Sequence, residues 1–307
     1  MTTPFVIRTE TNGREQNEDS VLALRLLPGL DQPPIFVLAI ADGMGGHPHG
    51  EKISREALKR LSVLLFEQLS VYPHLNQASS LEAVANTHIT NLLWSAMEET
   101  NSYLRRIITV NHWGLAGSTI VVALLFKDKV FVGNLGDSPL YHYQHDDRNL
   151  RKVTEDHTVA GVLLRNKLIS PEMARVHEGR SRLEYFFGRE ILPSEPPIHQ
   201  FNLVAGDKLL ICSDGVNGKL DESTINTILA NDTATLEQQA EQLLAAAREK
   251  GETDNQTLIL WQHRTLGSPE VTRLLPENSN EEPSSLLKTI KFDESNEAND
   301  RVEEHYE

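Results

Sequence analysis

An uninterrupted apolar run that ends in a carboxylate and a glycine-rich turn constrains this chain more than any other feature. Residues 35–41 are all Ile, Phe, Val, Leu or Ala, which predicts a buried strand. Asp42 follows at once, and Gly43, Gly45 and Gly46 free the backbone for positive φ or for close approach of a ligand. A carboxylate beside flexible glycine carbonyls is well placed to hold a cation. A tight strand-to-helix turn is the alternative, because Asp and Gly are also common turn residues.

The composition is that of a soluble globular protein and restricts the possible partners. The chain has 307 residues, of which 39% are hydrophobic and 24% charged, and its net charge is −15. We expect no nucleic-acid partner, because the chain is acidic and has no basic stripe. Cys212 is the only cysteine, which excludes an internal disulfide and a thiolate metal cage. The sequence has no apolar run of membrane-spanning length and no signal-like start, so we expect a cytoplasmic monomer.

The periodicity of apolar residues predicts the order of the elements. Helical spacing covers residues 51–69 and a second helix that ends near 108, and strands are expected at 119–126, 130–135 and 139–143. We expect two hairpins to join these three strands, through Lys127-Asp128 and Gly136-Asp137. Further strands are predicted at 209–212 and 257–261, with a helix at 236–247 between them. Helices and strands are therefore grouped instead of alternating, which predicts an α+β domain with antiparallel sheets.

The domain boundaries follow from composition. We expect one domain over residues 1–264, with a mixed, polar excursion from the core at about 155–197. Residues 265–307 contain 11 acids and 4 bases and are aperiodic, which predicts a disordered tail without a role in chemistry. Truncation after Gly267 should therefore leave the activity unchanged.

Acidic residues recur in short polar breaks beside the apolar runs. These breaks are Glu18-Asp19, Asp42-Gly43, Gly136-Asp137-Ser138, Ser213-Asp214-Gly215 and Asp254-Asn255. Layered antiparallel strands can bring such ends to one edge, where clustered carboxylates repel one another unless a cation neutralises them. Oxygen ligands without neighbouring Cys or paired His favour Mg²⁺ or Mn²⁺ over Zn²⁺. Each Asp-Gly alone is more typical of a turn, but the set of five predicts a metal site.

Six ordered motifs of this chain resemble those of a known family. They are Arg14-x-x-Asn17-Glu18-Asp19, Asp42-Gly43-Met44-Gly45-Gly46-His47-x-x-Gly50-Glu51, Gly117-Ser118-Thr119, Gly133-Asn134-Leu135-Gly136-Asp137-Ser138, Ser213-Asp214-Gly215 and Asp254-Asn255-x-Thr257. Their order and spacing resemble the PPM family of metal-dependent serine/threonine protein phosphatases, type 2C, and the second motif has a bacterial form. The resemblance extends over about residues 5–261 and implies an αββα sandwich, two antiparallel sheets flanked by helices.

The resemblance also implies a centre of two Mg²⁺ or Mn²⁺ ions. Asp42 would bridge both ions. Asp214 and Asp254 would complete one site, and Glu18 and the backbone carbonyl of Gly43 would complete the other. Two adjacent divalent ions lower the pKa of a shared water and offset charge on phosphoryl oxygens.

Two other residues would act on the water and the phosphate. The resemblance implies that Asp19 holds the metal-bound water by a hydrogen bond and that Arg14 clamps the phosphate. A planar guanidinium suits the second role because it meets two phosphate oxygens at once. Asp42, Asp19 and Arg14 are thus the expected catalytic residues.

The expected third metal site lacks a ligand in this sequence. In the family a weaker site draws on the equivalents of Asp137, Asp214 and an acid four residues after Asp214. Gly218 occupies that last position and has no side chain, so we expect the third site to be empty or only partly filled. If a third ion contributes to catalysis, turnover should be low or should depend on high metal, and Gly218→Asp should raise it.

Several other residues have competing interpretations. His47 could donate a proton to the leaving alkoxide, since its ordinary pKa lies near neutrality, but we favour a role in the polar turn. Cys212 lies on an apolar strand and is expected to be a small core residue. His157 and His177 fall in the 155–197 excursion and are expected at the surface. Ser118-Thr119 is expected to be structural.

The leading functional hypothesis is hydrolysis of phosphoserine and phosphothreonine in proteins, within signalling that involves a Ser/Thr kinase or its targets. The first alternative is an inactive phosphatase-like scaffold, but such a protein would have no need to keep Asp42, Asp214, Asp254 and Glu18 together. The second alternative is a phosphatase for a small phosphoester, because the motifs describe the reacting phosphate and say little about what carries it.

Overall fold

The computed structural model describes residues 4–27, 33–44, 49–70 and 82–264, and residues up to Thr265 form one compact unit. The strands are β1 (Phe5–Glu10), β2 (Asp19–Leu26), β3 (Ile35–Asp42), β4 (Ile120–Phe126), β5 (Lys129–Leu135), β6 (Leu140–Gln144), β7 (Asn149–Lys152), β8 (Ile198–Asn202), β9 (Lys208–Cys212) and β10 (Gln256–Gln262). The helices are α1 (Gly50–Ser70), α2 (Glu82–Val110), α3 (Val159–Arg165), α4 (Pro171–Val176), α5 (Asp214–Asn217), α6 (Glu222–Leu229) and α7 (Leu236–Glu249).

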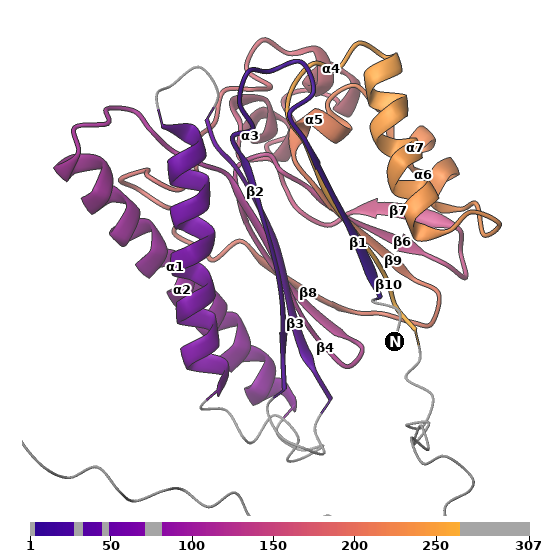
Figure 1. Ribbon diagram of the computed structural model, residues 1–307, viewed down its shortest axis with the longest axis horizontal. Coiled ribbons are helices and arrows are strands. Elements are labelled where there is room, and N and C mark those ends of the chain that lie inside the picture. Colours follow the sequence, from indigo (N-terminus) through magenta and orange to yellow (C-terminus); the bar gives the residue numbers. More distant parts are fainter. Residues whose placement is uncertain (1–3, 28–32, 45–48, 71–81, 265–307) are drawn as a thin grey trace, which may run out of the picture. The chain divides into compact units, whose positions relative to one another are not determined.

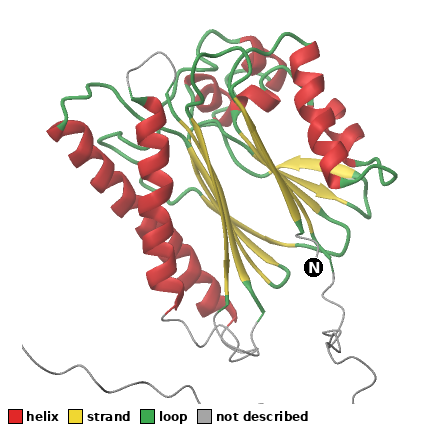
Figure 2. Ribbon diagram, in the orientation of Figure 1, coloured by secondary structure: helices red, strands yellow, loops and turns green. Residues whose placement is uncertain are grey.

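The strands form two five-stranded antiparallel sheets that face each other (Figure 2). The β1 sheet has the order β1-β10-β9-β6-β7, and the β2 sheet has the order β2-β3-β4-β5-β8. Both therefore combine strands from distant parts of the chain, as β1 pairs with β10 from Phe5↔Trp261 to Glu10↔Gln256.

Helices cover the outer face of each sheet (Figure 1). α1 and α2 pack on the β2 sheet, where Ile53, Leu61 and Leu93 are fully buried. α6 and α7 pack on the β1 sheet, where Ile225 and Leu243 are fully buried. The resulting layers confirm the predicted αββα sandwich.

The apolar run of β3 is continuous because both of its faces are buried. Val37 and Ala39 belong to the core under α1 and α2, whereas Leu38 and Ile40 belong to the core between the sheets. Successive side chains of a strand point to opposite faces, so a strand covered on both sides has no position for a polar residue until it ends. Asp42 is that end, directly after Ala41 of the core under α1 and α2 and Ile40 of the core between the sheets.

One predicted connection is wrong. The hairpin at Lys127-Asp128 is confirmed, since Phe126 pairs with Lys129. Gly136-Asp137, however, does not join a hairpin, because β5 lies in the β2 sheet and β6 lies in the β1 sheet. Pro139 has no backbone N–H for a strand ladder, and the chain crosses here from one sheet to the other. A local turn signal does not distinguish such a crossing from a hairpin.

Residues 155–197 contribute no strand to either sheet and contain α3 and α4. α4 begins at Pro171, and the Ser170 side chain caps it by accepting from the backbone N–H of Met173. The apolar pattern did not predict four short elements, β8, α3, α5 and α6. The periodicity of apolar residues is weak over so few positions. No helix in the described part of the chain combines the length and apolarity that crossing a membrane requires.

Candidate metal and phosphate site

The site is built around the Asp42 end of β3. In the antiparallel register of β2 and β3, Asp42 lies directly opposite Asp19. Thr119 fixes the backbone of Asp42, because its N–H donates to the Asp42 carbonyl at 2.8 Å and its Oγ1 accepts from the Asp42 N–H at 3.1 Å. Ser118 Oγ also donates to the same carbonyl, at 2.9 Å. Ser118 and Thr119 therefore position the central carboxylate, in agreement with their predicted structural role.

Asp19 reaches from the β2 sheet to the other sheet. Its Oδ2 accepts from Ser213 Oγ at 2.8 Å, and Ser213 is held at the end of β9 by a backbone hydrogen bond to the Thr257 carbonyl at 3.0 Å. Its Oδ1 is buried and has no hydrogen-bond partner among the described atoms. A buried carboxylate oxygen that accepts no hydrogen bond is suited to bind a cation or a further donor.

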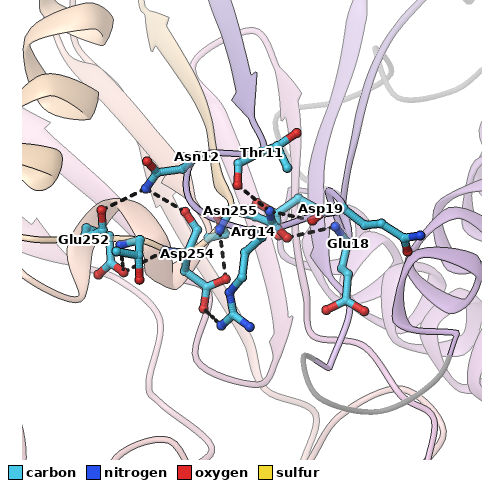
Figure 3. A network of polar contacts seen from close by, with 11 residues as sticks. Thr11, Asn12, Arg14, Glu18, Asp19, Glu252, Asp254 and Asn255 are labelled. Carbon is cyan, nitrogen blue, oxygen red and sulfur yellow. Dashed lines mark hydrogen bonds and ion pairs between the residues drawn. The ribbon is translucent and has the colours of Figure 1, made fainter.

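Asn255 holds the 11–18 loop against the start of β10 (Figure 3). Its Oδ1 accepts from the Glu18 N–H at 2.9 Å, and its Nδ2 donates to the carbonyls of Thr11 and Gln16, each at 2.9 Å. Asn255 is 5% exposed, so these bonds are shielded from water. The sequence motif contained Asn255, but only the structure shows that it places Glu18.

Glu18 and Gly43 meet where α1 begins. The Gly43 N–H donates to the Glu18 carbonyl at 3.1 Å, and a Cβ at Gly43 would lie 2.5 Å from the carbonyl of Gly50. A Cβ at Gly50 would lie 2.7 Å from Glu18 Oε1. The position of Gly43 therefore requires glycine, because a Cβ there would meet backbone atoms, whereas a Cβ at Gly50 would displace the Glu18 carboxylate from its position.

Asp214 and Asp254 enter the site from the β1 sheet. Asp214 is the first residue of α5, directly after β9, and Asp254 precedes β10. Arg14 Nη2 donates to Asp254 Oδ2 at 2.6 Å (Figure 3), so the predicted phosphate clamp lies at the site and contacts a predicted metal ligand. The structure thus brings together Arg14, Glu18, Asp19, Asp42, Asp214 and Asp254.

Burial and mutual repulsion raise the pKa values of these acids. Burial chiefly, and then Asp19 and Asp214, raise the pKa of Asp42 well above its ordinary value. Burial is also the main cause for Asp19 and Asp214, and it raises the pKa of each to about 6. For Glu18 the pKa is raised by burial and then by nearby Glu51. Buried like charges of this kind are expected where a bound cation completes the electrostatics.

A family model described as Protein phosphatase 2C matches residues 14–253, which include all six of these residues except Asp254. The chain belongs to the protein phosphatase 2C family. Its similarity to the serine/threonine phosphatase stp of Listeria innocua is 30% identity over 249 residues, which cover 80% of this chain and 90% of that one.

Solved structures of this phosphatase family are similar throughout the fold. The serine/threonine phosphatase PstP/Ppp of Mycobacterium tuberculosis is 26% identical, with a TM-score of 0.67, and the match covers 85% of this chain and 98% of that one. The catalytic domain of PstP in complex with two manganese ions is 25% identical, with a TM-score of 0.64, and the match covers 84% and 96%.

The carboxylates of this phosphatase 2C family member fit a divalent cation. The donors are all oxygens, the pKa values of the buried acids are raised, and Asp19 Oδ1 lacks a partner. As the side chains of the described residues stand, no three Asp, Glu, His or Cys lie close enough together to hold a metal ion. One carboxylate oxygen of Asp254 instead accepts from Arg14.

Asp137 lies on the connection between the two sheets and faces Asp214. Burial raises the pKa of Asp137 well above its ordinary value, and Asp214 and Asp156 add to the effect. Gly136 has a φ of +106°. His157 fixes this turn with two hydrogen bonds: its ring Nδ1 accepts from the Gly136 N–H, and its backbone N–H donates to the Gly136 carbonyl.

The prediction of a surface His157 is wrong. The residue is 5% exposed, and burial lowers its pKa to about 4, so the neutral ring is available as an acceptor. The polar sequence around His157 concealed this contact, which forms between segments 21 residues apart.

Gly218, which supplies no side-chain ligand to the expected third metal site, lies close to another acid, Glu252. A Cβ at Gly218 would lie 3.4 Å from Glu252 Oε2. The other oxygen of Glu252 accepts from the N–H groups of Thr253 and Asp254, at 2.9 and 3.0 Å. Glu252 thus brings a carboxylate close to the position where the sequence lacks one, and it also raises the pKa of Asp214.

The remaining predicted residues have simple outcomes. Cys212 is fully buried and burial raises the pKa of its thiol, which confirms a core role. His177 is partly buried and caps a turn by accepting from the Gly179 N–H at 3.0 Å. His47, the suggested proton donor, and the tail at 265–307 lie outside the described residues.

Proposed function

We propose that this chain hydrolyses phosphoserine and phosphothreonine in proteins, with two Mg²⁺ or Mn²⁺ ions as cofactors. The observation that carries the proposal is the convergence of Glu18, Asp19, Asp42, Asp214 and Asp254, which come from both sheets and the loops beside them. Bound divalent ions would activate water and offset the charge that develops on the phosphoryl oxygens. The names of the similar bacterial proteins support a serine/threonine phosphatase.

Five residues would supply the ligands of the two metal ions. Asp42 would bridge the ions, Asp214 and Asp254 would hold one, and Glu18 with the Gly43 carbonyl would hold the other. In support, Asp42 directly precedes Gly43, and its pKa is raised by burial and then by the charges of Asp19, Asp214, Asp137 and Asp254.

Asp19 and Arg14 would act on the reactants. Asp19 has one free oxygen and a pKa of about 6, which suits it to hold and accept a proton from the attacking water. Arg14 is half-exposed and can offer guanidinium N–H groups to a phosphate. Its contact with Asp254 keeps the guanidinium beside the reaction centre.

We further propose a cytoplasmic role in signalling, opposite a Ser/Thr kinase. The single, buried Cys212 fits a reducing compartment, where disulfides are rare. The kinase would supply the phosphoprotein that this enzyme consumes.

The test compares two substrates with metal-loaded protein. A phosphothreonine peptide and a generic aryl phosphate are incubated with Mn²⁺ or Mg²⁺, and inorganic phosphate is measured, with Asp42→Ala as the control. Hydrolysis of the peptide at a higher kcat/KM than the aryl phosphate supports a protein phosphatase. Hydrolysis of the aryl phosphate alone favours the small phosphoester alternative, and loss of both activities favours an inactive binding protein.

A further inference from the structure

Lys152 brings a positive charge into the pocket that holds the acids of the expected third metal site. This pocket, of about 530 Å³, is lined by Asp137, Asp214 and Gly218, and also by Lys152 and Asp156. Lys152 is the last residue of β7, and Asp156 lies four residues further along the chain. The position where the ligand set lacks an acid and a lysine of the chain are therefore part of the same cavity.

The β1 sheet directs the Lys152 side chain toward α5. Lys152 is paired with Tyr141 across β6 and β7, so the two side chains lie on the same face of the sheet. Tyr141 belongs to the core under α6 and α7, as does Val216 of α5. The Tyr141 hydroxyl also accepts from Asn217 Nδ2, at 3.4 Å. Lys152 thus lies on the face that carries α5, the helix that begins with Asp214.

Lys152 and Asp156 form a close ion pair. Lys152 Nζ donates to both carboxylate oxygens of Asp156, at 2.6 and 2.7 Å, and the two side chains are 22% and 36% exposed. The carbonyl of Asp156 accepts from Arg165 Nη1 at 3.2 Å and would lie 2.0 Å from a Cβ at Gly161, so its backbone is anchored as well. Salt screens a partly buried pair less than a fully exposed one, so the ammonium keeps a defined place in the pocket.

The charge of Lys152 acts beyond Asp156. Burial, and then Asp214 and Asp156, raise the pKa of Asp137, whereas Lys152 opposes the rise. Burial likewise raises the pKa of the Cys212 thiol at the end of β9, and Lys152 again opposes the rise. Because charge interactions weaken with distance, the ammonium lies near both the connection that carries Asp137 and the strand that leads to Asp214.

We propose that the Lys152 ammonium takes the electrostatic place of the third metal ion in this chain. The inference rests on the proposed phosphatase function. Gly218 supplies no side chain where the family's third site needs an acid, so the described residues do not complete that site. Lys152 offsets the charge of Asp137 without any ligand at that position, and its own charge repels a further divalent cation. Lys152 is thus a positioning residue, which acts through Asp156 and Asp137.

The test counts the Mn²⁺ ions bound by the full chain, by isothermal titration calorimetry. K152M removes the ammonium but keeps a long side chain, and K152Q is a second neutral variant that keeps a donor for Asp156. We expect both to bind a third Mn²⁺ about tenfold more tightly than wild type, the effect of removing one unit charge a few ångströms from a divalent ion in a wet pocket. Binding of the first two ions shows that the variants are folded. K152R keeps the charge and should retain the wild-type affinity for a third ion.

A matched control lies next to Lys152 on the same strand. Arg151 points to the opposite face of β7, where its guanidinium lies 5.9 Å from the centre of the Phe201 ring. R151M removes the same charge from the chain but not from the pocket, so its third-ion affinity should equal that of wild type. An equal gain in R151M and K152M would reduce the effect to net charge and overturn the proposal. A K152R variant that behaves like K152M would also overturn it.

Turnover measured beside binding separates this inference from the proposed function. With a phosphothreonine peptide, the wild-type rate should reach its plateau once two Mn²⁺ ions are bound, whereas the rate of K152M should change further as the third ion binds. A third ion that binds more tightly to K152M and K152Q supports the role of Lys152 even if no peptide is hydrolysed, and then only the proposed function fails. Fast hydrolysis with the same ion binding in wild type and both variants overturns the inference and leaves the proposed function intact.

Discussion

Asp19 and Asp42 lie directly opposite each other across β2 and β3, and both are largely removed from water. Opposed carboxylates in an antiparallel pair repel each other, and burial strengthens the repulsion. The fold holds them together through Ser213, which donates to Asp19, and through Ser118 and Thr119, which fix Asp42. The protein therefore maintains a local charge arrangement that is unfavourable in the absence of cations.

Replacement of Asp42 by Asn should separate stability from activity. We expect D42N to abolish hydrolysis, because the bridging carboxylate is lost. In metal-depleted protein the same variant should raise the Tm by about 2–4 °C, since an amide of similar shape removes the buried charge at a gain of about 1 kcal/mol. Calorimetry and a phosphate-release assay measure the two effects. D146N, which changes an exposed acid, is the control and should alter neither.

The metal-depleted protein should lose stability as the pH rises from about 4 to 6. The pKa values of Asp19 and Asp214 are about 6 in the folded chain, above the ordinary 3.8, so the folded state binds more protons in this window. The free energy of unfolding therefore falls through these pH values. Thermal unfolding of wild type and of a D19N D214N variant isolates the contribution of these two acids, so the pH dependence should be smaller in the variant, which keeps the raised pKa values of Asp42 and Asp137. An identical pH dependence of both proteins would contradict the assigned pKa shifts.

Arg14 should contribute mainly to phosphate binding. We expect R14A to raise KM by about tenfold, the effect of losing a charge-assisted hydrogen bond, and to lower kcat less. R14K keeps the charge but not the planar fork, so its KM should lie between those of R14A and wild type. Steady-state kinetics with a phosphothreonine peptide provide both constants. A normal KM with a much lower kcat would place Arg14 in the chemical step instead.

Asn255 should control the order of the 11–18 loop. N255A removes one acceptor and two donors from a buried position, so we expect a loss of about 1–3 kcal/mol in the free energy of unfolding. Amide hydrogen exchange in residues 11–18 should become faster, and the affinity for Mn²⁺ should fall as Glu18 loses its position. N12A is the comparison, because the Asn12 side chain donates to the carbonyls of Glu252 and Asp254 and not to Glu18 or its neighbours. Unchanged exchange in N255A would show that the loop is held by other contacts.

The third metal site should depend on Gly218 and Glu252 together. We expect wild type to bind two Mn²⁺ ions per chain at millimolar concentration, with the third site empty or only partly filled. The structure changes the expectation for G218D alone, which should add little, because its Cβ would lie 2.8 Å from the Asp214 carbonyl and its carboxylate would lie near Glu252 Oε2. G218D combined with E252Q removes the charge repulsion, so with a small shift of the turn it should bind more of the third ion than G218D alone and raise turnover. Isothermal titration counts the ions, and a fully occupied ion on Asp137 in a Mn²⁺-soaked crystal of wild type would refute the expectation.

The sequence by itself determined the layers of this protein and the chemical type of its site. The all-apolar β3 required burial on both faces, the grouping of helices and strands required antiparallel layers, and five acidic breaks beside apolar runs predicted a metal site. Asp42, Asp214 and Asp254 were identifiable because each ends or precedes an apolar strand, a pattern visible along the chain. Local turn chemistry also located the hairpin at Lys127-Asp128 correctly.

Only the tertiary structure decided which acids are neighbours and what holds them. The crossing at Gly136-Asp137 places two consecutive strands in different sheets. The contact of His157 with Gly136, the three bonds of Asn255 and the approach of Glu252 to Gly218 each join segments separated along the chain. Hydrophobic periodicity reports which face of an element is buried, but it contains no information on which other element covers that face. Hydrogen bonds and charge pairs depend on atomic distances between such elements, so they appear only when the two sheets pack together.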